Sequence, residues 1–305
     1  MKKSIFQDNR YRILLAIGCA IGWSLAHPFI KCGYQSFNIS FNDIGGKVLF
    51  AGIRFLLAGL LLLIFACPHQ KKPFVKNKKD YSWLVLFALI NITFHYMFAY
   101  IGLGHIPGSR STILDSLGGF VLIILAGLID SSDSFNQKKL LGIILGLTGI
   151  LCINIQPGQS YFENITWIGD GMLILNGLFG AFGGLLTRFL SKRTNMTYAT
   201  AFSMTFGGLA LILLATLFHP QSQWNITLEG AGILLILVLI SAVCFGVYNQ
   251  LLAYHPISKV AIFNALIPIL GVFFSALLLK EPLKIQYIFS MILVSLGIFI
   301  VNREA

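Results

Sequence analysis

Runs of apolar residues about twenty positions long follow one another along the chain, separated by short polar stretches. Within each run, polar and apolar residues do not alternate as they do in a half-buried strand. A helix needs about 20 residues to cross a hydrocarbon core about 30 Å thick. The pattern therefore predicts an all-α membrane protein with ten transmembrane helices, at residues 12–34, 47–67, 81–103, 109–130, 138–155, 167–190, 197–218, 229–254, 258–280 and 285–302.

The composition agrees with a chain that lies almost entirely in a lipid bilayer. Of its 305 residues, 56% are hydrophobic and 11% are charged, and the mean hydropathy is +0.81. Soluble domains carry about 25% charged residues. Because nothing long remains outside the ten ranges, any function must lie within the bundle. The five cysteines form no CxxC pair, and we expect them to be small apolar residues, with no metal site and no cofactor.

The formal charge of +11 suggests a nucleic-acid partner, but the positions of the basic residues argue against one. A topology of ten helices places most of them on the same side of the membrane: the amino terminus and residues 71–79, 138–139, 192–193, 259 and 303. Loops that face the cytoplasm are enriched in Lys and Arg. We therefore expect a multi-pass membrane protein with both termini in the cytoplasm, and no nucleic-acid partner.

The two halves of the chain resemble each other. An offset of 149 residues sets residues 106–120 against residues 255–269, so that Pro107 meets Pro256 and Asp115 meets Asn264. Each half, 1–156 and 157–305, holds five predicted helices. An odd number of helices makes the second half enter the membrane from the opposite side, which predicts two inverted five-helix repeats. Inverted repeats are typical of carriers that alternate their access around a site near the midplane.

Several stretches resemble the EamA-type carriers of the drug/metabolite transporter superfamily. They are AIGWSLAHPFIK (20–31), AGIRFLLAGLLLL (51–63), GDGMLILNGLFGAFGG (169–184) and NALIPILGVFFSALLLKEPL (264–283). The resemblance covers nearly the whole chain and implies an inner-membrane carrier of ten helices. Where the second half has Pro268, the first has Gly118 and Gly119, and we expect both places to act as gating bends. The family carries many different small molecules, so the resemblance does not select a substrate.

Four ionisable residues lie in predicted helices at a similar depth: His27, Arg54, His95 and Asp115, each about six to eight residues from the outer end. At 1.5 Å per residue, this is roughly 10 Å below the outer face. Ionisable side chains inside a bilayer are costly and mark functional sites. The residues expected to bind substrate or to take part in coupling are Asp115, Arg54, His27, His95, Trp23, Tyr100, Tyr248, Asn249 and Asn264.

The chemistry of these side chains suits a zwitterion such as an amino acid. Asp115 can bind an ammonium group or take up a coupling proton, and Arg54 can hold a carboxylate by its planar fork. His27 and His95 can relay protons, because imidazole titrates near neutrality. Two other interpretations remain open: Arg54 and Asp115 can neutralise each other as a structural pair, and each histidine can be a packing residue.

We therefore predict a secondary-active transporter of a small polar or zwitterionic, amino-acid-like metabolite, with alternating access around a central cavity and protons as a candidate coupling ion. Export is the direction that the resemblance implies. The alternatives are an uptake carrier or exchanger for a charged metabolite, and a multidrug exporter. An intramembrane aspartyl protease would use two aspartates such as Asp115 and Asp170, but Trp167 occupies the position of the first glycine in the GxGD signature. No enzyme is predicted, and the sequence leaves the oligomeric state open.

Overall fold

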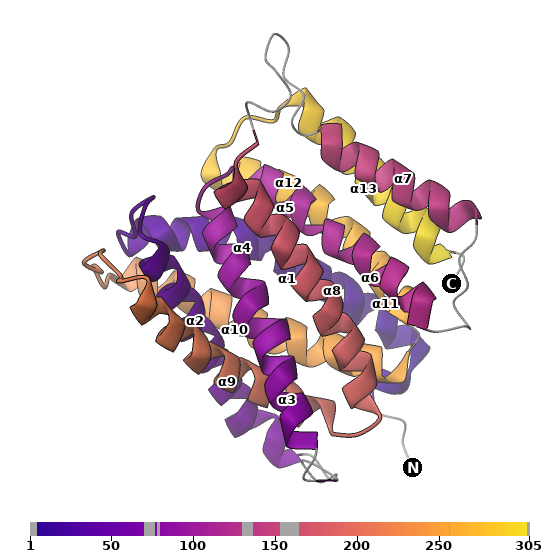
Figure 1. Ribbon diagram of the computed structural model, residues 1–305, viewed down its shortest axis with the longest axis horizontal. Coiled ribbons are helices and arrows are strands. Elements are labelled where there is room, and N and C mark those ends of the chain that lie inside the picture. The colour runs from indigo at the N-terminus through magenta and orange to yellow at the C-terminus, as the bar shows by residue number, and fades with distance from the viewer. Residues whose placement is uncertain are drawn as a thin grey trace.

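The computed structural model describes residues 5–69, 77, 80–129, 137–152, 165–255 and 257–303, and these residues form helices and no strands. The helices are α1 (Asn9–Ser36), α2 (Ile44–Phe65), α3 (Asp80–Ala88), η3 (Leu89–Phe94), α4 (His95–Leu103), α5 (Gly108–Asp115), α6 (Leu117–Ile129), α7 (Gln137–Cys152), η6 (Trp167–Gly171), α8 (Met172–Ser191), α9 (Met196–Leu217), α10 (Leu228–Tyr254), α11 (Ile257–Ala261), η7 (Ile262–Ala265), α12 (Leu266–Leu279) and α13 (Ile285–Arg303). Figure 1 shows them packed into one bundle.

Each of the ten predicted ranges coincides with a helical stretch of the structure. Six stretches are long and apolar enough to cross a membrane: 9–36, 44–65, 80–103, 167–191, 196–217 and 228–254. The chain is therefore a multi-pass membrane protein. The other four stretches are shorter or interrupted, and their crossing of the bilayer stays a prediction. The basic loop at 71–79, apart from Asn77, and the predicted boundary between the halves at 156/157 lie outside the described residues.

Two of the stretches are broken near the middle of the molecule. Ser116 separates α5 from α6, and the 3-10 turn η7 separates α11 from α12. Pro268 is the third residue of α12, where its missing N–H breaks no bond within the helix. The break therefore comes before the proline, and Gly118 and Gly119 likewise follow the break at Ser116. The predicted bends lie beside these breaks, and their role in gating stays a prediction.

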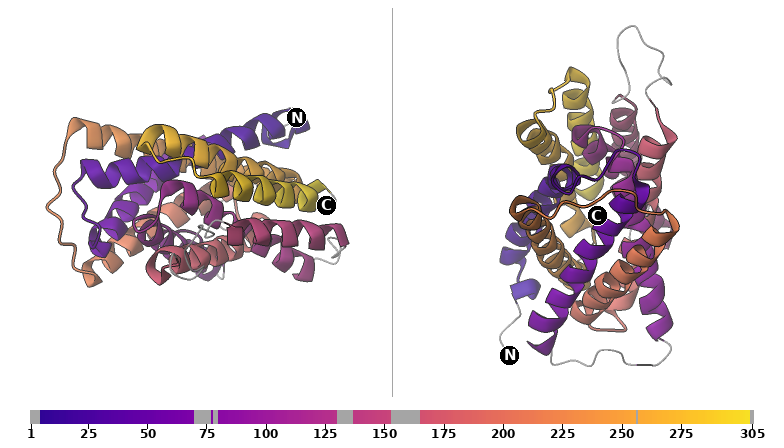
Figure 2. Two further views of the ribbon diagram at one scale, coloured as in Figure 1. Left: turned by 90° about the horizontal axis from the view of Figure 1, so that it is seen from above. Right: turned by 90° about the vertical axis from the view of Figure 1, so that its left-hand side faces the viewer.

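The packing joins helices that are far apart in the sequence (Figures 1 and 2). Helix α2 runs along α9, and α7 runs along α13; α1 contacts α10 and α12, while α8 contacts α4 and α6. Glycines allow the closest approaches. A Cβ at Gly297 would lie 2.8 Å from the backbone nitrogen of Gly146 and would also strike the carbonyl oxygen of Gly142. Lipid provides little drive for helix association, so small residues that let backbones approach are the usual solution in membranes.

Polar contacts tie the helices together at the end of the bundle away from both termini (Figure 2, left). Asp43 caps α2 by accepting from the backbone N–H of Gly46 at 2.7 Å and also accepts from that of Ser222 at 2.8 Å. Glu281 accepts from the backbone N–H groups of Gly108 and Ser109, at 2.7 and 3.0 Å, at the start of α5. These contacts hold the loops at this end of the bundle against the first turns of α2 and α5.

The contact between α7 and α13 gives a first prediction. Gly297→Ala should lower the free energy of unfolding by about 1–3 kcal/mol, because the added methyl group meets backbone that cannot rotate away. The matched control is Gly18→Ala in α1, where a Cβ meets nothing within 4 Å. Thermal unfolding in detergent compares the two variants. Equal melting temperatures for both would contradict the packing described here.

Asp43 gives a second prediction. Burial raises the pKa of Asp43, but hydrogen bonds from Ser222 and Gly46 outweigh it and hold the pKa below the ordinary value of 3.8. A carboxyl group with a depressed pKa stabilises the fold above its unfolded-state pKa and loses this effect as the pH falls through its folded-state pKa. Asp43→Asn should therefore melt below the unchanged protein at pH 7, and the difference should shrink toward about pH 3. A difference that is the same at both values would refute the assignment.

Candidate functional site

A cavity of about 200 Å³ lies among α1, α2, η3, α4, α5, α6, α8, α10, η7 and α12. All nine residues that the sequence singles out for binding or coupling line it: Trp23, His27, Arg54, His95, Tyr100, Asp115, Tyr248, Asn249 and Asn264. Gly118 and Gly119 also line the cavity. Pro268 is buried in α12 and lies outside the lining. The structure thus brings together side chains from both halves of the chain.

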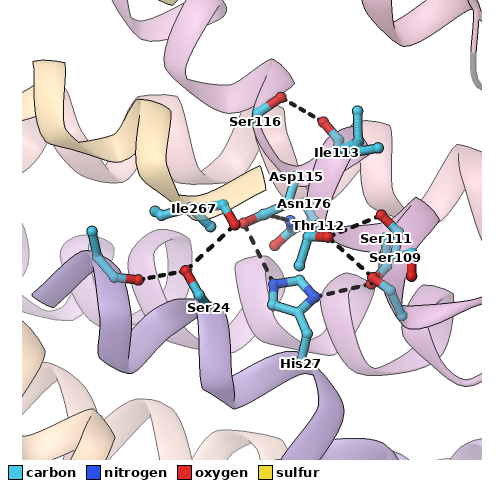
Figure 3. A network of polar contacts seen from close by, with 12 residues as sticks. Ser24, His27, Ser109, Ser111, Thr112, Ile113, Asp115, Ser116, Asn176 and Ile267 are labelled. Carbon is cyan, nitrogen blue, oxygen red and sulfur yellow. Dashed lines mark hydrogen bonds and ion pairs between the residues drawn. The ribbon is translucent and has the colours of Figure 1, made fainter. Parts of the chain in front are cut away.

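Asp115 is the last residue of α5, at the break before α6, and its carboxylate faces α1 and α8 (Figure 3). Its Oδ2 lies 3.8 Å from Nε2 of His27, and its Oδ1 accepts from Nδ2 of Asn176. On its other side, His27 contacts Ser111 through Nδ1 at 2.9 Å. The hydroxyl of Ser111 in turn donates to the carbonyl oxygen of Gly108 at 2.8 Å. A chain of polar groups therefore runs from α5 through α1 and back to α5.

Arg54 lies fully inside the bundle, 1% exposed, and its hydrogen bonds go to uncharged groups. Nε donates to Oγ of Ser241 at 2.7 Å and to the carbonyl oxygen of Leu237 at 3.1 Å, and Nη1 donates to the hydroxyl of Tyr100 at 2.7 Å. The guanidinium also lies 5.1 Å from the ring centre of Phe55. These contacts orient the fork without neutralising its charge.

Arg54 and Asp115 form no ion pair with each other among the described residues. In the described structure, each of the two residues is instead held by other groups. Each takes partners from other helices, because their own helices present them to different neighbours. The cavity thus holds a positive and a negative group that are fixed separately. A buried cation without an anionic partner is costly in a membrane unless something else supplies the negative charge.

The remaining predicted residues form a mainly aromatic wall on the side of α1 and α10. The ring of Trp23 meets that of Tyr248 edge to face with centroids 4.8 Å apart, and it meets Phe245 at 5.5 Å. Asn264 donates from Nδ2 to the hydroxyl of Tyr248 at 2.9 Å. Asn249 is turned toward α9, where its Nδ2 donates to Oγ1 of Thr200 at 2.9 Å. Asn249 thus has a partner in the bundle, while Trp23 and Tyr248 line the cavity in contact with each other.

Two asparagines of the site are absent from the residues predicted to bind or couple: Asn91 in η3 and Asn176 in α8, both of which line the cavity. Each is a single amide in an apolar helix, and this is the signal by which the sequence could have identified them. In the structure they are 7% and 1% exposed. A row of glycines on α8 makes room for this side of the site. A Cβ at Gly180 would lie 2.6 Å from the ring of His95, and one at Gly183 would strike Asn91.

Several buried polar atoms that belong to cavity residues have no hydrogen-bond partner in the described structure. They are Nε1 of Trp23, Nδ2 of Asn91, Nδ1 of His95 and Oδ1 of Asn176. Buried polar groups are almost always hydrogen-bonded, so each such atom requires an explanation. All four belong to residues of the cavity lining, so unpaired polar groups are concentrated in the wall of this site.

The second aspartate considered for protease chemistry lies elsewhere. Asp170 in η6 pairs with Arg110 of α5 and accepts from the backbone N–H of Thr166 at 2.9 Å. It is 3% exposed and outside the cavity lining. The two aspartates therefore do not face each other across one site, as the catalytic pair of an aspartyl protease does.

A helical bundle in the membrane, with ionisable side chains around a cavity, is an arrangement expected of a transport protein. The model of the EamA-like transporter family matches residues 10–155 and 167–303. The chain belongs to this family. It is 29% identical to the uncharacterized transporter YvbV of Bacillus subtilis over 97% of this chain and 93% of the relative. It is 28% identical to the uncharacterized transporter sll0355 of Synechocystis over 83% and 81%.

A more distant relative is a WAT1-related chloroplastic protein of Arabidopsis thaliana, 26% identical over 85% of this chain and 63% of the relative. One solved structure, described only as a crystal structure of a protein, superposes with a TM-score of 0.68. It shares 11% sequence identity, and the match covers 95% of this chain and 97% of that chain. This likeness shows a common fold.

The cavity gives a third prediction. In a variant with all five native cysteines replaced by Ala, Gly119→Cys should react with a small charged thiol reagent. Gly119 lines the cavity, and a Cβ there meets nothing within 4 Å, so water can ionise the thiol that reacts. Gly18→Cys is the control, because it lies on the outer surface of α1 within the bilayer. Equal labelling at both positions would argue against a water-accessible cavity.

Proposed function

We propose that this protein is a secondary-active transporter of small zwitterionic metabolites of the amino-acid type. The observation that carries the proposal is that Arg54 and Asp115 line one cavity without pairing with each other. The fork of Arg54 matches a carboxylate, and its Nη2 donates no hydrogen bond to a described residue. A zwitterion supplies the missing anion together with a cation for the acidic side of the cavity.

Alternating access between two inverted repeats is the mechanism that we propose. The contacts support it, because they pair helices as a two-fold axis would: α2 with α9, α7 with α13, and the contacts of α1 with α10 and α12 mirrored by those of α8 with α4 and α6. The helix breaks support it too, since Ser116 and Ala265 are 149 residues apart. Broken helices beside a central site are a recurring feature of carriers.

We propose export across the inner membrane, with both termini in the cytoplasm and protons as the coupling ion. Both termini lie at the same end of the bundle (Figure 2, left), which supports this topology. The basic loops indicate that this end faces the cytoplasm. The direction of transport follows the resemblance to EamA-type exporters. The contact between His27 and Asp115 supports proton coupling.

An exchanger for an anionic metabolite is the second candidate. The observation that favours it is the uncompensated charge of Arg54, which by itself suits a carboxylate without an amino group. A panel of amino acids, their des-amino acids and their decarboxylated amines separates the two candidates. Stabilisation against heating by amino acids alone supports the zwitterion; equal stabilisation by the des-amino acids supports the exchanger.

The fourth prediction concerns Asp115. Asp115→Asn should abolish transport or uncouple it from the pH gradient, because an amide can neither carry the coupling proton nor supply negative charge. Amino-acid flux in reconstituted vesicles, with and without a pH gradient, measures both effects. The control is Ser203→Ala, a buried residue of α9 outside the cavity. Unchanged flux and unchanged pH dependence in a folded Asp115→Asn protein would refute the role of Asp115.

A further inference from the structure

The amide of Asn176 on α8 contacts Asp115 (Figure 3). Its Nδ2 donates to Oδ1 of Asp115, while its own Oδ1 is buried and has no hydrogen-bond partner in the described structure. An ionised carboxylate only accepts hydrogen bonds, so it holds the amide nitrogen toward itself and leaves the carbonyl oxygen unpaired. Asn176 is 1% exposed and is one of the residues that line the cavity, so this unpaired acceptor belongs to the wall of the site.

His27 faces both Ser111 and Asp115. Nδ1 lies 2.9 Å from the hydroxyl of Ser111, and which of the two donates depends on the tautomer of the ring. In the tautomer with the proton on Nδ1, that nitrogen donates to Ser111, and the hydroxyl donates to the carbonyl oxygen of Gly108. Nε2, which faces Asp115 at 3.8 Å, then has room for one further proton. The pair of His27 and Asp115 is neutral with this proton and carries one negative charge without it.

From these contacts we propose that Asn176 recognises the ammonium group of the substrate through Oδ1. Binding of the ammonium group and protonation of the pair of His27 and Asp115 then exclude each other. The inference rests on the proposed function and assigns it a recognition residue. An ammonium group at Oδ1 lies one amide away from the carboxylate and favours the negative state of the pair. The added proton removes the charge that attracts the ammonium group.

The exchange balances. One proton leaves Nε2 of His27 or the Asp115 carboxyl for water on the side to which the cavity is open, and one ammonium cation takes its place. No covalent bond other than that to the proton changes, and no electrons are transferred. By linkage, protonation weakens substrate binding by the same factor by which substrate weakens protonation. A carrier that releases substrate when it takes up a proton works as a proton antiporter.

Other titratable groups face the same cavity and set a fixed background for this exchange. They are Arg54 on α2, His95, Tyr96 and Tyr100 on α4, and Tyr248 on α10. The parts of α8 and α12 that line the cavity contribute no titratable side chain among the described residues. The positive charge of Arg54 opposes protonation of the pair whether or not substrate is bound. It also attracts the carboxylate of the substrate. Asn176 is the cavity residue that contacts Asp115 from the side of α8.

The experiment uses the full-length protein in detergent and each of the twenty common L-amino acids as a probe, followed by the des-amino acid of every probe that binds. Binding is measured by calorimetry between pH 5 and 8 in buffers of different ionisation enthalpy, which reports the protons released. The unchanged protein should release up to one proton for each amino acid bound. Asn176→Ala should weaken amino-acid binding by about 10- to 150-fold, the loss of one charged hydrogen bond, and should release fewer protons.

The des-amino acids distinguish recognition of the ammonium group from a merely structural role of Asn176. They lack the ammonium group, so Asn176→Ala should leave their affinity unchanged. Asn176→Ser, which keeps an acceptor oxygen, serves as a second variant if the alanine variant fails to fold, and Ser203→Ala is the control outside the cavity. Amino-acid binding without proton release, or equal weakening of both ligand classes, would overturn the role of Asn176 and leave the proposed function standing. Failure of every amino acid both to bind and to be transported would overturn the two together.

Discussion

The constraint on which the structure depends is that hydrocarbon solvates neither charges nor unpaired polar groups. Every ionisable side chain in the bundle must therefore find its partners on neighbouring helices or in a cavity. Arg110 and Asp170 satisfy each other at one end, whereas Arg54 and Asp115 do not pair across the centre. The first arrangement holds helices together. The second leaves charge available, and this difference separates structural charges from those we assign to transport.

The two halves supply a symmetric scaffold with an asymmetric lining. With the offset of 149 residues, Asp115 corresponds to Asn264 and His27 corresponds to Asn176, and all four residues line the cavity. Arg54 corresponds to Ser203, which lies outside the lining. The first half thus carries the charges, and the second half carries neutral groups at matching positions. A two-fold scaffold allows the helices to exchange conformations, while the unequal lining allows one site to tell the ends of a zwitterion apart.

Close packing and the open cavity are made by the same residue type in different settings. Gly297, Gly142 and Gly146 let α13 and α7 approach until backbone meets backbone. On α8, Gly177 lets α6 approach, with a Cβ there only 2.9 Å from the backbone nitrogen of Gly118, whereas Gly119 on α6 faces open space in the lining of the cavity. Where a facing helix supplies backbone, a glycine gives contact. Where no atom faces the glycine, it leaves space for a ligand.

The sequence by itself determined the helices and the ionisable residues that lie at a similar depth within them. Hydropathy and helix length are local properties, so the ten predicted ranges coincide with helical stretches, and the cost of burying charge drew attention to His27, Arg54, His95 and Asp115, which do share one cavity. Only the tertiary structure decided how these groups are paired. The partner of a buried charge depends on which helices cross at its depth and on which side of each helix faces inward. For this reason Arg54 bonds to Ser241 and Tyr100, Asp115 bonds to Asn176, and an amide that looked unremarkable in an apolar helix lies at the centre of the site.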